Sequence, residues 1–116
     1  MKYLVVDDAK LARKMMIKAL KEFIDDQDTI IEACDGKEAL EAYKKDNFDL
    51  IFMDLTMPIM DGFEATEAIL QYNPQAKVII VSADIQEQAI QKVLEIGAMK
   101  FIKKPVDKAQ LVEFFQ

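Results

Sequence analysis

The sequence predicts an α/β protein in which a five-stranded parallel sheet carries helices on both faces. Two observations support this fold class. Short apolar runs alternate five times with amphipathic segments, a rhythm that is typical of βαβ units. The run from Leu50 to Met53 is apolar without alternation, as expected for a strand covered on both faces. Right-handed crossovers then favour a doubly wound sheet with strand order 2-1-3-4-5, in which the first and third strands are neighbours.

Each expected strand is followed by a helix. The predicted strands are residues 2–6, 29–33, 50–53, 77–81 and 100–103. The predicted helices are residues 10–23, residues 37–45, a segment that follows Gly62 and runs to about residue 72, a segment marked by residues 85–94, and about 107–115. Asp35 is expected to cap the second helix, and Gly97 is expected to end the fourth.

The side-chain pattern predicts which face of the first helix is buried. That face is expected to consist of Leu11, Met15, Ala19, Leu20 and Phe23. Arg13 and three lysines lie largely on the opposite face. In the last helix, Phe114 and Phe115 are adjacent, so two arrangements are open. Either one ring is exposed to a partner, or both pack against the edge of the sheet.

Length and composition indicate one domain that spans residues 1–116. Hydrophobic residues make up 52% of the chain and charged residues 31%, which is a globular balance. The net charge of −6 argues against nucleic-acid binding through a phosphate-neutralising surface. No apolar run approaches the ~20 residues that span a bilayer, and the N-terminal run is too short for a signal peptide. We therefore expect a cytoplasmic protein without membrane insertion.

Several classes of site are excluded by residues that the chain lacks. It contains no histidine, which removes Ser-His-Asp and Cys-His catalysis and histidine-ligated zinc. Cys34 is the only cysteine, so an internal disulfide is impossible, and we interpret this residue as a small packing residue. None of the three glycines follows the first strand, where a nucleotide-binding loop needs them.

Polar side chains stand where the predicted strands end. These residues are Asp7, Asp8, Asp54, Ser82 and Lys104. In the predicted topology they meet at one edge of the sheet, where three acids would repel one another unless a hard divalent cation such as Mg²⁺ lies between them. Ser82 and Lys104 could then bind phosphoryl oxygens. Taken singly, Asp8 and Ser82 could be helix caps, Lys104 a surface lysine and Asp54 a loop acid.

Five motifs together resemble a known family. They are Val5-Val6-Asp7-Asp8, the segment from Met53 to Gly62, Val81-Ser82-Ala83, Gly97-Ala98 and the segment from Phe101 to Pro105. In this order and spacing they resemble the receiver domain of two-component response regulators, almost from end to end. The resemblance implies a flavodoxin-like (βα)5 three-layer sandwich.

The resemblance also implies a role for each site residue. Asp54 would accept a phosphoryl group, and Lys104 would contact it. Asp8 would bind Mg²⁺ directly, with Asp7 in support, and Asp54 and the backbone carbonyl of Thr56 would complete the protein ligands.

Two further residues would form the switch. Ser82 would be the switch hydroxyl and Phe101 the switch aromatic side chain. The Lys104-Pro105 peptide bond would be cis.

The implied function is a phosphorylation-activated signalling switch that slowly dephosphorylates itself and is not a turnover enzyme. Since the chain has no histidine, the donor would be a partner histidine kinase or phosphotransfer protein. A downstream protein would bind the surface of the fourth helix, fifth strand and fifth helix. A stand-alone regulator is the simplest expectation, and a domain taken from a longer protein would show the same sequence features.

Two other functions remain open at this point. The first is a Mg²⁺-dependent phosphatase with an aspartate nucleophile. It lacks support because Thr56 occupies the position where such enzymes carry a general acid. The second is a protein-binding module that uses the fold without phosphorylation.

Overall fold

Five parallel strands form one sheet in the order β2-β1-β3-β4-β5, so the predicted topology is confirmed. The structure is a computed structural model that describes residues 1–83 and 86–115. The strands are β1 (Lys2–Val6), β2 (Thr29–Ala33), β3 (Leu50–Met53), β4 (Val78–Ser82) and β5 (Lys100–Lys103). Because β1 pairs with both β2 and β3, the carboxyl ends of β1 and β3 lie side by side.

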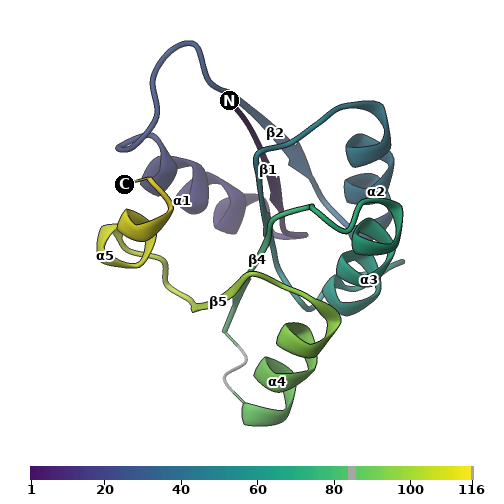
Figure 1. Ribbon diagram of the computed structural model, residues 1–116. Coiled ribbons are helices and arrows are strands. Elements are labelled where there is room, and N and C mark those ends of the chain that lie inside the picture. The colour runs from purple at the N-terminus through teal and green to yellow at the C-terminus, as the bar shows by residue number, and fades with distance from the viewer. Residues whose placement is uncertain (84–85, 116) are drawn as a thin grey trace.

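Helices cover both faces of the sheet, as predicted (Figure 1). On one face lie α1 (Lys10–Leu20) and α5 (Lys108–Leu111), and on the other lie α2 (Gly36–Lys45), α3 (Gly62–Tyr72) and α4 (Glu87–Ile96). A short 3₁₀ turn, Val112–Phe114, follows α5. Within the described part of the chain, no helix combines the length and the apolar character required to span a bilayer.

The core has two halves, one on each side of the sheet. Side chains alternate along β3, so Ile51 and Met53 pack with α2, α3 and α4, whereas Phe52 packs with α1 and α5. All three are at most 1% exposed. This double coverage explains why the sequence of β3 shows no polar alternation.

Most helix boundaries follow the expected local signals. The side chain of Asp35 accepts a hydrogen bond from the backbone N–H of Glu38, so its predicted role as a cap is confirmed. Asp61 and Asp107 form capping boxes at the starts of α3 and α5. Gly97 ends α4 with a positive φ of 124°. Ile85, which we assigned to the fourth helix, lies outside the described residues.

The predicted buried face of the first helix is confirmed for Leu20, which is buried, and for Ala19 and Phe23, which pack against the core, but it is wrong for Leu11 and Met15. Leu11 is 71% exposed and Met15 54% exposed, while Met16 and Leu20 are buried. Phe23 lies beyond the end of α1. The error arises because residues 15–17 are three consecutive apolar residues, which fit either of two adjacent helix faces.

The last helix is shorter than predicted. It contains 4 residues and passes into the 3₁₀ turn, which stops before Phe115. Phe114 and Phe115 are both half-buried and pack against the α1 side of the core. The ring of Phe115 stacks on Phe23 with centroids 5.1 Å apart. The second arrangement, in which both rings pack inward, is therefore the one observed.

Candidate functional site

Three strand ends bring charged side chains to one place. Backbone hydrogen bonds fix each of them: the N–H of Asp54 donates to the carbonyl of Val6 at 2.9 Å, and the N–H of Lys104 donates to the carbonyl of Ser82 at 2.9 Å. The N–H of Asp7 donates to the carbonyl at the end of β2. The positions of these residues are thus determined by the sheet itself and not by mobile loops.

The carboxylates of Asp7, Asp8 and Asp54 form an acidic cluster. One oxygen of each lies within 4.8 Å of the others. Asp7 and Asp54 are buried, whereas Asp8 is exposed. Three carboxylate oxygens at this spacing are a donor set that suits a hard divalent cation of the size of Mg²⁺, and the exposed Asp8 leaves a path from solvent.

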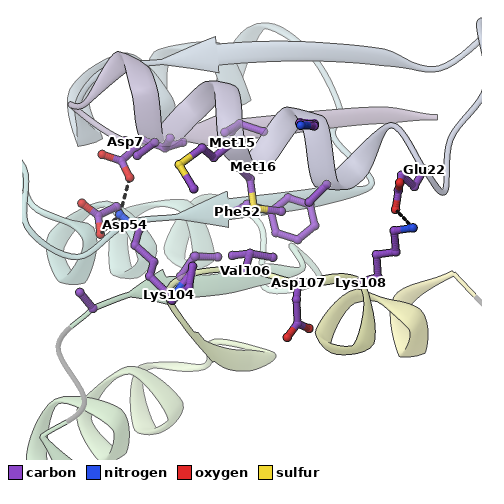
Figure 2. Close-up of a pocket in the computed structure, with 18 residues that line it drawn as sticks. Asp7, Met15, Met16, Glu22, Phe52, Asp54, Lys104, Val106, Asp107 and Lys108 are labelled. Atoms are coloured by element: carbon purple, nitrogen blue, oxygen red, sulfur yellow. Dashed lines mark hydrogen bonds and ion pairs between the residues drawn. The ribbon is translucent and has the colours of Figure 1, made fainter.

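Lys104 bridges the two buried acids. Its Nζ lies 2.6 Å from Oδ2 of Asp7 and 3.3 Å from Oδ1 of Asp54 (Figure 2). The peptide bond between Lys104 and Pro105 is cis, as expected from the resemblance. The ammonium group therefore already sits beside the carboxylate that would receive a phosphoryl group.

The site perturbs the pKa values of Asp54 and Lys104. Burial, together with the charge of Asp7, raises the pKa of Asp54 although Lys104 opposes the shift. Burial by itself would lower the pKa of Lys104, but hydrogen bonding to Asp7 and the charge of Asp54 outweigh it and raise that pKa. Lys104 consequently stays a cation, and the negative charge on Asp54 is held in unfavourable surroundings.

The simple capping roles that the sequence left open are not observed. Among the described residues, the N-cap of α1 is Ala9 and that of α4 is Gln86, so neither Asp8 nor Ser82 is the N-cap residue of the helix after it. Asp7 instead stabilises the turn before α1, since its Oδ1 accepts a hydrogen bond from the backbone N–H of Ala9 at 3.0 Å.

The other predicted site residues lie at the same end of the sheet or next to it. Ser82 is 3% exposed at the end of β4. Phe101 is half-buried in β5, in register with Ile80 of β4. Thr56 is exposed in the loop that follows Asp54.

Two residues near the site were not identified from the sequence. Arg13, placed on the solvent face, donates from Nη1 to the backbone carbonyl of Asp7 at 2.7 Å and from Nε to Glu32 at 2.9 Å. No local pattern marks Arg13 for this role. Gly62 was identified only as the last residue of one motif and as the residue before a helix, without a packing role. A Cβ there would lie 2.1 Å from the carbonyl oxygen of Asp54, so this residue sets how closely α3 approaches the site.

The comparisons with known proteins agree on one family. The model of the response regulator receiver domain matches residues 3–116. Protein CcdB of Bacillus subtilis is 41% identical over 112 residues, which cover 95% of this chain and 90% of CcdB. The chemotaxis protein CheY of Treponema pallidum is 40% identical over 111 residues, covering 95% of this chain and 76% of that protein.

Solved structures show the same likeness. The crystal structure of a CheX–CheY–BeF3–Mg²⁺ complex from Borrelia burgdorferi superposes with a TM-score of 0.85 and 34% identity, covering 97% of this chain and 84% of that one. The structure of the response regulator TrrA of Thermotoga maritima, in complex with Mg²⁺ and BeF, superposes with a TM-score of 0.83 and 27% sequence identity. The match covers 97% of this chain and 94% of TrrA. The chain belongs to the response regulator receiver domain family and is similar to CheY chemotaxis proteins.

Proposed function

We propose that this chain works as a single receiver domain over residues 1–116 and is a signalling switch activated by phosphorylation of Asp54. The observation that carries the proposal is the arrangement of Asp54: a buried carboxylate next to two further acids, with the ammonium of Lys104 at 3.3 Å. A carboxylate nucleophile and a cation at this separation are suited to hold the oxygens of one phosphoryl group.

Asp7, Asp8, Asp54 and the backbone carbonyl of Thr56 would hold a Mg²⁺ ion. When bound, the ion would neutralise negative charge on the phosphoryl oxygens. The acidic cluster supports this assignment through its three oxygens within 4.8 Å. A complex of the relative from Borrelia burgdorferi contains both Mg²⁺ and BeF3.

Asp54 and Lys104 perform the phosphoryl transfer. A carboxylate oxygen of Asp54 attacks phosphorus in line, the new O–P bond forms, and the bond from phosphorus to the leaving group breaks. Lys104 donates hydrogen bonds to the transferring oxygens, and its raised pKa keeps it protonated for this purpose. The product is an aspartyl phosphate, which is slowly hydrolysed, so the protein is not a turnover enzyme.

The phosphoryl group would come from a partner and act on a partner. The chain has no histidine, so the donor is a histidine kinase or a phosphotransfer protein. The added charge, close to two negative units, draws in Ser82 and lets Phe101 repack. This change alters the surface of α4, β5 and α5, where a downstream protein binds. The equilibrium between two existing states shifts.

Incubation with acetyl phosphate and Mg²⁺, followed by intact-mass measurement, tests the proposal. We expect one phosphoryl adduct, which is lost in Asp54→Ala and on addition of a chelator. Asp49→Ala, which removes an exposed acid outside the cluster, is the matched control and should still form the adduct.

Two results would contradict the proposal. If the wild type forms no adduct, the chain is a binding module that does not use phosphorylation. If phosphate is released continuously from many unrelated phosphate esters, the chain is a phosphatase.

A further inference from the structure

An apolar groove begins at the acidic cluster and runs along α1. It has a volume of about 670 Å³ and lies between α1 and residues 104–108 (Figure 2). This groove, which we call the α1–α5 groove, is closed at its far end by an ion pair of 2.8 Å between Glu22 and Lys108. Its apolar walls include Ala12, Met15, Met16, Ala19, Phe52 and Val106.

One end of the groove carries the charged residues of the candidate site. Asp7, Asp54 and Lys104 line it there, while the walls beyond them are largely apolar (Figure 2). Its volume falls within the roughly 300–1,000 Å³ typical of small-molecule sites, which combine apolar walls with a few polar groups. A ligand that fits both parts has a polar head and an apolar tail.

We propose that the α1–α5 groove binds the acyl chain of a small phosphodonor, so that acyl phosphates with a medium-length apolar chain phosphorylate Asp54 faster than acetyl phosphate does. This inference rests on the proposed function, because it assigns a class of donor to the same nucleophile.

Charge complementarity selects the phosphoryl head. The ammonium of Lys104 presents positive charge to a dianionic phosphoryl group, and a divalent cation held by the acidic cluster would add to it. An amphiphile with an ammonium head would instead meet Lys104, which already lies 2.6 Å from Asp7 and occupies the position of the cation. A donor without an apolar tail would leave the walls of the groove in contact with water.

The walls can adapt to a flexible chain. Met15 is 54% exposed although it lines the groove, and its unbranched thioether side chain can move to cover an incoming methylene chain. Ala12 and Ala19 are small, so α1 leaves room between itself and the sheet.

The transfer balances without a further reactant. An oxygen of Asp54 forms a bond to phosphorus, and the bond between phosphorus and the bridging acyl oxygen breaks. The electron pair of that bond stays on the acyl oxygen, which leaves as the carboxylate of the free acid. Because the P–O–C linkage bends at this oxygen, the acyl chain can turn from the line of attack into the groove.

Rate constants for acetyl, butyryl and octanoyl phosphate test the proposal, measured by intact mass at equal Mg²⁺. Full burial of one methylene strengthens binding up to about fourfold, and an open groove buries each only in part. We therefore expect octanoyl phosphate to react at least about tenfold faster than acetyl phosphate, with butyryl phosphate between them.

Groove variants separate chain binding from chemistry. Met15→Ser and Ala19→Phe should reduce the rate with octanoyl phosphate at least about threefold and leave the rate with acetyl phosphate unchanged. Leu11→Ser is the matched control, since Leu11 is an exposed residue of α1 outside the groove. If Ala19→Phe does not fold, the exposed Met15 still provides the test.

The outcomes are distinct. Equal rates for all chain lengths, or an equal loss in Leu11→Ser, would overturn the groove as an acyl site while leaving phosphorylation of Asp54 intact. Absence of an adduct with every donor, acetyl phosphate included, would overturn both proposals.

Discussion

Asp54 carries a carboxylate in surroundings that disfavour its charge. It is 8% exposed, and burial together with Asp7 raises its pKa. A raised pKa in the folded state means that the ionised form is less stable there than in the unfolded chain. Ionised Asp54 therefore lowers the stability of the fold, and carboxylates with a perturbed pKa are common at functional sites.

Asp54→Asn should stabilise the protein in a pH-dependent way. The folded pKa exceeds that of a free aspartate, so ionised Asp54 destabilises the fold above the folded pKa and has no such effect once it is protonated in both states. The gain from asparagine should therefore be full above the folded pKa of Asp54 and disappear as the pH falls from the folded pKa to that of free aspartate. Urea unfolding above the folded pKa and below the pKa of free aspartate measures this gain in the free energy of unfolding. Asp49→Asn is the control, and lower stability of Asp54→Asn above the folded pKa would show that the attraction to Lys104 outweighs burial.

The start of α3 packs against the loop that follows Asp54 and holds it in place. The N–H of Gly62 donates to the carbonyl of Leu55 at 2.9 Å, and Asp61 caps the helix through Glu64. The helix backbone reaches the loop only because Gly62 has no side chain, since an added Cβ would lie 2.8 Å from the Cα of Leu55. The helix and the strand end are therefore packed backbone against backbone.

Gly62→Ala should impair both stability and phosphorylation. The added methyl group overlaps backbone that cannot move cheaply, so we expect a loss of at least about 2 kcal/mol in the free energy of unfolding and slower reaction with acetyl phosphate. Gly97→Ala is a useful comparison, because its positive φ of 124° should cost about 1 kcal/mol without a change in the reaction rate. If both variants slow the reaction with acetyl phosphate to the same extent, Gly62 has no specific role in positioning the site.

At the scale of the whole molecule, aromatic contacts tie the end of the described chain to its beginning. Phe115 stacks on Phe23 after α1 and lies 5.8 Å from the ring of Tyr3 in β1. These contacts complete the side of the core that α1 and the short α5 share. The ribbon shows the C-terminal end of the described chain beside α1 (Figure 1).

Phe115→Ala should therefore destabilise the whole fold. Loss of a half-buried ring that contacts two others is expected to cost about 2 kcal/mol, seen as a lower urea midpoint. Val112→Ala, at an exposed position of the 3₁₀ turn that precedes Phe115, should change the stability by less than about 0.5 kcal/mol. Similar small effects of both substitutions would show that the end of the chain contributes little to the core.

The strands, their order, the cap at Asp35 and the polar residues at the strand ends could all be predicted from the sequence. These features follow from the periodicity of nearby residues and from the handedness of βαβ connections. Packing in three dimensions was needed to show that Met16 is buried and Met15 is not, that Arg13 donates to the carbonyl of Asp7, and that an apolar groove adjoins Asp54. The same holds for the contact between Lys104 and Asp7, which lie 97 residues apart. The physical reason is that such contacts depend on how whole elements pack against one another, which no local pattern of side chains specifies.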